Sequence, residues 1–147
     1  MDNDFYSVSA GNSLYVDPEF TGDNALYWAD AGEEKMQMAV YKPHLDWTRL
    51  SKVYPDVTLF GDNGVTPGDL RQGSIGNCWV MSGASAVAEV PGRIEKLFLN
   101  NSNSLNANGI YGVNIYALGV PHTILVDDFL PLKASTEKTF FAHIGDD

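Results

Sequence analysis

The sequence predicts an α+β domain with one core, built around a central buried helix and an antiparallel hairpin. From Cys78 to Glu89 the residues are apolar or small on nearly every face, which is typical of a buried helix. From Ile110 to Asp127 apolar and polar residues alternate on both sides of a short link, which indicates a β-hairpin. A chain of 147 residues is long enough for one such core, so we expect a single domain over residues 1–147.

The first 60 residues are rich in aromatic residues, Asp and Asn, and they show no sustained periodicity. We therefore expect residues 1–60 to form an irregular wrap on the core, with a helical turn between Asp30 and Val40. Residues 61–147 then supply a loop, the helix and the hairpin. That loop opens with GDNGVTPG, whose density of Gly, Pro, Asn and Asp is typical of turns.

Two shorter elements follow from the remaining pattern. The segment GRIEKLFL, residues 92–99, has the spacing of a short amphipathic helix between Pro91 and a polar loop. After the hairpin the tail turns apolar at Phe140 and Phe141, which is typical of a strand without its partner. These two aromatic residues are also expected to form an exposed apolar edge.

The charge of the chain narrows the class of partner. Nineteen acidic and nine scattered basic residues give a net charge of −10, which argues against nucleic acid and anionic membranes and favours a divalent cation or a basic protein. No apolar stretch approaches the ~18 residues of a membrane-spanning helix. The N-terminus lacks the pattern of a signal peptide, and the single cysteine agrees with a reducing compartment, so we expect a cytoplasmic protein.

Residues 72–79 read QGSIGNCW and include the only cysteine, Cys78. At the start of the predicted helix, unpaired N–H groups and the helix dipole favour its thiolate, so Cys78 is a candidate nucleophile. Gly73 and Gly76 are expected to leave the approach to the sulfur open. The amide of Gln72 and the backbone N–H of Cys78 are expected to bind the oxyanion of an attacked carbonyl. The alternative is a packed core cysteine, since free cysteines are often buried.

The spacing Q-G-S-x-G-x-C-W favours the catalytic alternative, and it makes the chain resemble the papain-like proteases and the calpains. Papain-like enzymes usually carry a cysteine at the position of Ile75, whereas calpains carry an aliphatic residue there. The stretches LYVDPEF, DWTRLSKVYPDVTLFG and VDDFLP also resemble the calpain protease core. The resemblance extends over residues 12–147 and favours the calpain family.

This resemblance implies the first, nucleophile-bearing subdomain of a calpain protease core, which is incomplete without a second subdomain. It implies that Cys78 is the nucleophile, that Gln72 is the oxyanion donor, and that Trp79 matches the tryptophan after the nucleophile. The activity implied is calcium-dependent cleavage of a polypeptide substrate.

The resemblance also implies a Ca²⁺ site in the loop before the nucleophile. Asp69 matches a carboxylate ligand, Gly64 a carbonyl ligand, and Asp62 the position of a further carbonyl, and oxygen-rich loops suit this ion. The family's second acidic ligand lies beyond Asp147. The alternative is that this stretch is only a polar turn.

A cysteine protease needs an imidazole to move the proton of the thiol. In papain-like enzymes that histidine follows the cysteine by about 130 residues or more, beyond Asp147. We expect His44, His122 and His143 to be surface or strand-edge residues, and no residue matches the family's orienting asparagine. Three alternatives follow: half of a split protease, a fragment of a longer one, or a non-catalytic structural or interaction subunit of a larger assembly. A second protein chain then completes or covers the cleft.

Overall fold

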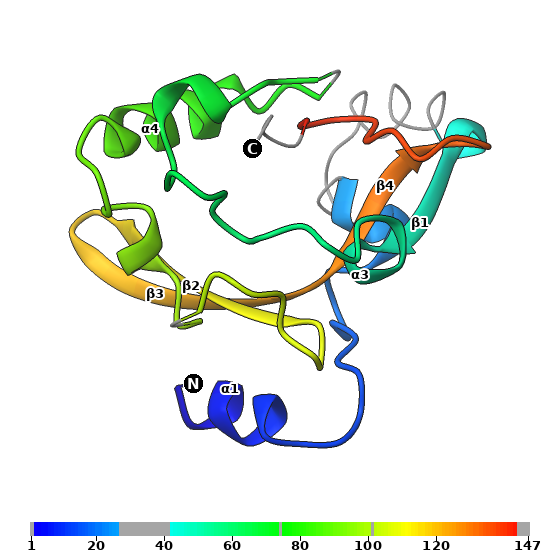
Figure 1. Cartoon of the computed structure of the whole chain (residues 1–147), viewed down its shortest axis with the longest axis horizontal. Helices are drawn as coiled ribbons and strands as arrows, with labels where there is room; N and C mark the ends of the chain where they lie inside the picture. Colours follow the sequence, from blue (N-terminus) through cyan, green and yellow to red (C-terminus); the bar gives the residue numbers. More distant parts are fainter. Residues whose placement is uncertain (1, 27–41, 74, 101, 144–147) are drawn as a thin grey trace.

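The computed structural model describes residues 2–26, 42–73, 75–100 and 102–143. In this part of the chain helices combine with antiparallel strands, which confirms the predicted α+β class (Figure 1). The helical turn predicted between Asp30 and Val40 lies outside the described residues. Within them, no helix has the length and apolar character needed to cross a bilayer. In chain order the elements are α1 (Asp2–Ser9), η1 (Gly22–Leu26), η2 (Lys42–His44), β1 (Leu45–Arg49), α3 (Leu50–Val53), η3 (Pro67–Asp69), α4 (Cys78–Ala88), η4 (Glu95–Leu97), β2 (Ile110–Ala117), β3 (Val120–Asp127) and β4 (Phe129–Lys133).

Strands β2 and β3 form the predicted hairpin with the predicted limits. Ile110 lies opposite Asp127, and Ala117 lies opposite Val120. The turn consists of Leu118 and Gly119 alone, with φ of 52° and 81°. Two positive φ values are the signature of a type I′ turn, whose twist matches that of the flanking strands. The link between the two strands is therefore only two residues long.

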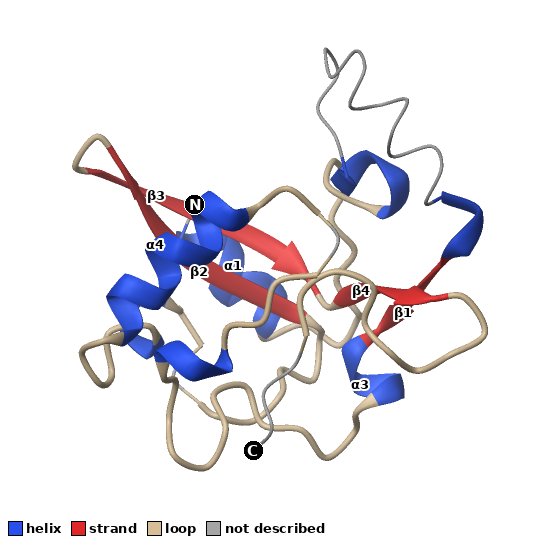
Figure 2. Cartoon of the chain, turned by 90° about the horizontal axis from the view of Figure 1, so that it is seen from above, coloured by secondary structure: helices blue, strands red, loops and turns tan. Residues whose placement is uncertain are grey.

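Strands β1 and β4 form a second antiparallel pair, separate from the hairpin (Figure 2). Leu45 pairs with Lys133 and Arg49 with Phe129. The prediction of an irregular wrap was therefore wrong for β1, and also for helix α1. This strand could not be predicted because its five residues do not alternate regularly between apolar and polar. Its partner strand also lies some eighty positions later in the sequence.

A buried ion pair stands at the end of the β1–β4 sheet. Arg49 and Asp128 are each 5% exposed, and the Arg49 guanidinium donates to the Asp128 carboxylate. The guanidinium also donates to the Tyr15 carbonyl over 2.7 Å and lies 4.4 Å from the centre of the Phe129 ring. Ser51 Oγ donates to the second carboxylate oxygen over 3.3 Å. We call this group the Arg49–Asp128 node.

The adjacent Asp127 ties the N-terminal segment to the end of the hairpin. Its Oδ2 accepts the N–H of Asp17 over 2.9 Å, and its Oδ1 accepts the N–H of Phe129 over 3.1 Å. Asp17 is buried, and its own carboxylate accepts the N–H groups of Glu19 and Phe20. The stretches LYVDPEF and VDDFLP, far apart in sequence, are thus joined by hydrogen bonds.

Helix α4 spans the predicted residues to within one position, but the prediction that it is buried was wrong. Ala88 is its only buried residue, whereas Trp79 is 76% exposed and Val80 is 44% exposed. A helix that is apolar all round becomes buried only where other elements cover it. In the described residues α4 contacts η3, while the core gathers elsewhere, on Phe5, Ile110, Tyr111, Leu132 and Phe141.

Two further predictions were also wrong. The GRIEKLFL segment forms only the short η4 turn, because Leu99 leaves the helical path and donates its N–H to Gly112 of β2 over 2.8 Å. The tail forms no strand over residues 134–143. Instead it makes isolated bridges, from Thr139 to Leu132 and from His143 to Arg71. Phe141 is 7% exposed and packs against Phe140, so it forms part of the core and not an exposed edge.

Candidate active site

Cys78 is the first residue of α4, and its thiol is free and exposed. The preceding Asn77 carbonyl accepts the N–H groups of Val80 and Met81 over 3.0 and 3.1 Å, which starts the helix. Within the described residues, Cys78 is therefore not a packed core cysteine. An exposed thiol at a helix N-terminus is accessible to a substrate and lies beside the unpaired N–H groups of the first turn.

Gln72 is exposed, and its side chain is held by the loop that leads to Cys78. Its Nε2 donates to the Ile75 carbonyl over 2.8 Å. The same carbonyl accepts the Asn77 N–H over 2.9 Å, so one oxygen anchors both the amide of Gln72 and the start of α4. Because a glutamine amide carries two protons, the bond to Ile75 orients the group and leaves one proton for another acceptor.

The two glycines of residues 72–79, which we call the octet, have different surroundings. A Cβ on Gly76 meets nothing within 4 Å. A Cβ on Gly73 would lie 1.7 Å from the Phe141 carbonyl oxygen, closer than any real contact. Gly73 is therefore required for the approach of the tail's main chain, a role that the sequence did not reveal. Ser74 lies outside the described residues.

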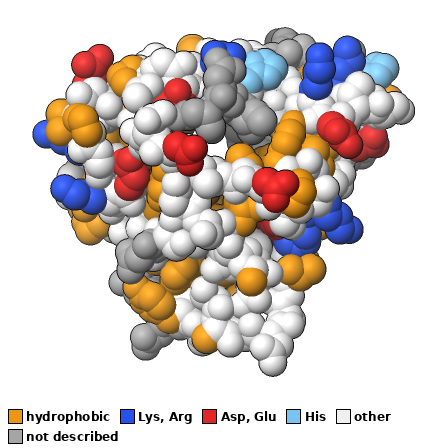
Figure 3. Space-filling view, viewed as in Figure 1, with side chains coloured by type: hydrophobic (Ala, Val, Ile, Leu, Met, Phe, Trp, Pro, Cys, Tyr) orange, Lys and Arg blue, Asp and Glu red, His pale blue; other side chains and the backbone are white. Residues whose placement is uncertain are grey.

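The indole of Trp79 points mainly into solvent, at 76% exposed. Trp79 thus lies next to the thiol in the sequence but packs little against the rest of the chain. Figure 3 shows that apolar side chains also reach the surface in other places on the face seen there. Among the described residues, the side chains at the start of α4 are left exposed to solvent, namely those of Cys78, Trp79 and Val80.

The loop proposed to bind a cation has a clear local structure. Thr66 and Asp69 form a capping box around η3, in which Asp69 Oδ2 accepts the Thr66 N–H over 2.7 Å and the Thr66 hydroxyl over 3.0 Å. Gly64 has a φ of 76°, and Asp62 is exposed. Asp69 therefore already has hydrogen-bond donors in this loop, which agrees with the polar-turn alternative.

Glu95 is a carboxylate at this loop that sequence reasoning missed. Its Oε1 accepts the Val65 N–H over 3.3 Å and would lie 3.0 Å from a Cβ on Gly64, while its buried Oε2 has no hydrogen-bond partner among the described residues. Glu95 comes from η4, thirty residues later than Val65, so no local motif could have revealed it. In the described ranges, no three His, Cys, Asp or Glu side chains form a group able to hold a metal. A cation here would depend on backbone carbonyls as well as carboxylates.

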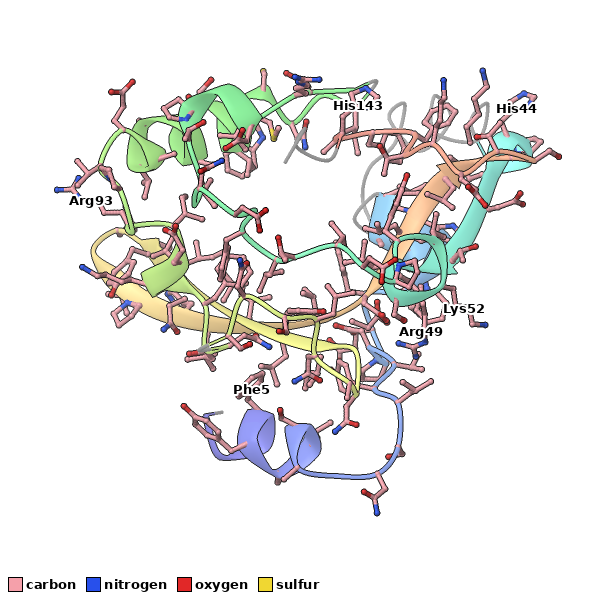
Figure 4. All side chains as sticks on the ribbon, in the orientation of Figure 1. Phe5, His44, Arg49, Lys52, Arg93 and His143 are labelled. Atoms are coloured by element: carbon pink, nitrogen blue, oxygen red, sulfur yellow. The ribbon has the colours of Figure 1, made fainter. Side chains whose placement is uncertain are left out.

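The three histidines are exposed and lie on separate elements, as expected. His44 is in η2, His122 is in β3, and His143 is in the tail, where its N–H donates to the Arg71 carbonyl over 3.0 Å. Figure 4 places His44 beside β1 and His143 at the end of the tail. In the part of the chain that the structure describes, no imidazole hydrogen-bonds to the Cys78 thiol. Within the described residues, the geometry therefore brings together an exposed thiol and an oriented amide, and it places no hydrogen-bonded imidazole beside them.

Comparison with known proteins agrees with these features. A model of the calpain family of cysteine proteases matches residues 15–146, which include the octet, both strand pairs and the Arg49–Asp128 node. A calpain-type cysteine protease of Oryza sativa subsp. japonica is 24% identical over 138 residues, covering 90% of this chain and 6% of that protein.

Two animal proteins show a similar relation. Calpain-13 of Rattus norvegicus is 25% identical over 119 residues, covering 81% of this chain and 17% of its own length. Calpain-5 of Mus musculus is 29% identical over 127 residues, covering 80% of this chain and 18% of its own length. The chain thus spans less than a fifth of each of these relatives.

Proposed function

The chain belongs to the calpain family of cysteine proteases, and on that basis we propose that it carries the nucleophile half of a calpain-like cysteine endopeptidase. The observation that carries this proposal is the free, exposed Cys78 at the first residue of α4, six residues after an amide oriented by its own loop. The fold proposed with it is the first subdomain of the calpain protease core. The substrate is a polypeptide, and the proposed location is intracellular.

In the proposed reaction the Cys78 thiolate attacks the carbonyl carbon of a peptide bond, and the carbonyl oxygen becomes an oxyanion. Gln72 donates its remaining amide proton to that oxygen, together with the backbone N–H of Cys78. The leaving amine then takes a proton, and an acyl-enzyme results. The imidazole that removes the thiol proton and delivers it to the amine comes from a second subdomain or a partner chain.

Labelling of Cys78 by a peptidyl epoxide tests this function. The thiolate opens the epoxide ring and forms a thioether, and the peptide part reports a substrate site. With its native partners present, the wild-type chain should react faster with the peptidyl epoxide than with a small epoxide, and Gln72→Ala should reduce this preference. Equal rates for the two reagents, in the presence and absence of Ca²⁺, would remove the protease assignment.

Ca²⁺ forms part of the proposal, through the Asp69 carboxylate and the carbonyls of Gly64 and Asp62. Support comes from the donor set, since hard cations bind carboxylate and carbonyl oxygens. It also comes from Glu95 beside this loop, whose buried Oε2 has no hydrogen-bond partner in the part of the chain that the structure describes. When bound, Ca²⁺ would supply positive charge to these oxygens. Asp69 is separated from Gln72, the first residue of the octet, by only Leu70 and Arg71.

Titration of Ca²⁺ followed by tryptophan fluorescence tests the site. Asp69→Ala should weaken binding, and Asp56→Ala, an exposed carboxylate outside the loop, is the matched control. Asp69→Asn separates a lost charge from a lost capping box, because an Asn oxygen still accepts the bonds from Thr66. Identical curves for wild type and both Asp69 variants would exclude Asp69 as a ligand.

A second function is favoured by one specific observation, the exposed apolar surface. Trp79 in α4 and Ile115, Tyr116 and Val120 in the hairpin are between 49% and 76% exposed. These side chains support a non-catalytic, calpain-like structural or interaction subunit that binds another polypeptide. Partner binding by Cys78→Ser at wild-type strength, with no peptidyl epoxide labelling of the wild-type complex, would favour this function over proteolysis.

A further inference from the structure

Residues 138–143, which we call the strap, connect the octet to the β1–β4 sheet. At one end the Lys138 carbonyl accepts the Lys133 N–H over 2.9 Å, and Phe140 donates its N–H to Pro131 in β4 over 3.0 Å. At the other end His143 donates its N–H to the Arg71 carbonyl over 3.0 Å. The strap thus bonds to β4 and to the residue immediately before Gln72.

Contact between the strap and the octet is closest at Gly73. The position of a Cβ on Gly73 is 1.7, 2.3 and 2.6 Å from the O, C and Cα of Phe141. All three atoms belong to the main chain, so no side-chain rotation relieves this overlap. The strap cannot retreat freely either, because the Phe141 side chain is buried and Phe140 is hydrogen-bonded to Pro131 in β4.

Gln72 lies between two residues that contact the strap. Its neighbours on either side, Arg71 and Gly73, both contact the strap, and its amide donates to Ile75. The backbone and the side chain of Gln72 are therefore held by separate interactions. A displacement of residues 71–73 would change the direction of the amide relative to the start of α4.

We propose that the strap is a positioning element for Gln72, acting through the contact of Phe141 with Gly73. This inference deepens the proposed function and rests on it, because it assigns a purpose to the orientation of the oxyanion donor. Small errors in the placement of a catalytic group are costly, since a shift of about 1 Å lowers rates by about 100-fold. An added methyl group at Gly73 is expected to cause a displacement of that kind.

The test compares Gly73→Ala with Gly76→Ala in the full chain. Both variants add one methyl group within the same octet, but only the first meets the strap. The first readout is the side-chain amide resonance of Gln72 in the NMR spectrum, assigned by its loss in Gln72→Ala. The second is the rate of reaction with peptidyl epoxide divided by the rate with iodoacetamide, which needs no oxyanion donor.

Gly73→Ala should move the Gln72 resonance and lower the rate ratio by about tenfold or more, whereas Gly76→Ala, the control for the NMR readout, should leave the Gln72 resonance unchanged. A purely structural role would lower the melting temperature of Gly73→Ala without moving the Gln72 resonance, and that result would overturn the proposal. If Gly73→Ala does not fold, Phe141→Ala serves instead, because it keeps the strap's main chain but empties the buried position that holds it. An unmoved Gln72 resonance in a folded Phe141→Ala would equally overturn the proposal.

The NMR readout also separates this inference from the proposed function. A wild-type chain with no preference for the peptidyl epoxide would remove the protease assignment, while a moved Gln72 resonance in Gly73→Ala would still show that the strap positions the side chain. An unmoved resonance beside a clear wild-type preference would keep the assignment and remove the strap's role.

Discussion

The Arg49–Asp128 node and the octet lie at opposite extremes of burial in this molecule. In the node two opposite charges are each 5% exposed and are surrounded by a ring, a hydroxyl and a carbonyl. In the octet, Gln72, Gly76, Cys78 and Trp79 are all exposed. The node holds segments that are distant in sequence, whereas the octet presents functional groups to solvent. The buried ion pair therefore joins distant segments inside the core, while the Cys78 thiol lies outside it.

The largest expected effect comes from breaking the node. Arg49→Ala leaves the Asp128 carboxylate buried without its counter-ion, which should cost about 3–5 kcal/mol of unfolding free energy. Lys52→Ala on α3 is the control, because Lys52 is exposed and its loss should change stability by less than about 0.5 kcal/mol. Urea unfolding measures both. Similar losses for the two variants would mean that the node does not hold the fold.

A smaller effect should appear at alkaline pH beside the node. Burial raises the pKa of Tyr111 above its ordinary value of 10.0, and the nearby charge of Asp128 raises it further, while the hydrogen bond from the Asn106 N–H partly opposes this change. Because the folded-state pKa lies above the unfolded one, the stabilising contribution is complete below pH 10.0 and is lost as the pH rises through the raised value.

Tyr111→Phe removes the ionising group and should lose less stability than wild type between neutral and strongly alkaline pH. Part of the decline should remain, since burial also raises the pKa of Tyr15, with help from the charges of Asp17 and Asp127. Urea unfolding on both sides of the ordinary tyrosine pKa measures the slopes. A steeper alkaline decline in Tyr111→Phe would contradict the assignment.

The smallest effect on stability is expected from a substitution in the exposed octet. Trp79→Ser removes a side chain that is 76% exposed, so it should change stability by less than about 0.5 kcal/mol. Thermal unfolding by circular dichroism measures this variant. A loss of more than about 1 kcal/mol would show that α4 is covered in solution by something that the described residues do not include.

Elements with a strong local pattern could be predicted from the sequence. Residues 110–127 alternate regularly, and β2 and β3 begin and end where the pattern does. The limits of α4 also followed from local composition. Its exposure did not, since composition shows that a helix is apolar but not whether other elements cover it.

Features that depend on distant residues could not be predicted. The approach of Phe141 to Gly73 and that of Glu95 to Val65 join residues 68 and 30 positions apart. Gly73 could be identified as part of a motif, but the reason why a glycine is needed there is the close approach of the Phe141 main chain. Octet spacing could identify Cys78 and Gln72 as candidates, whereas the orientation of Gln72 by Ile75 required the structure.

The most direct test of the central claim, that Cys78 is a nucleophile served by an oriented Gln72, is the binding of a peptide aldehyde with an isotope-labelled carbonyl carbon. The thiol adds to the aldehyde carbon, its proton passes to the oxygen, and a tetrahedral hemithioacetal forms. The account predicts a hemithioacetal carbon resonance, distinct from that of the hydrated aldehyde, with the wild-type chain and its native partners, a weaker one with Gln72→Ala, and none with Cys78→Ser. The same carbon spectrum with wild type and Cys78→Ser would contradict it.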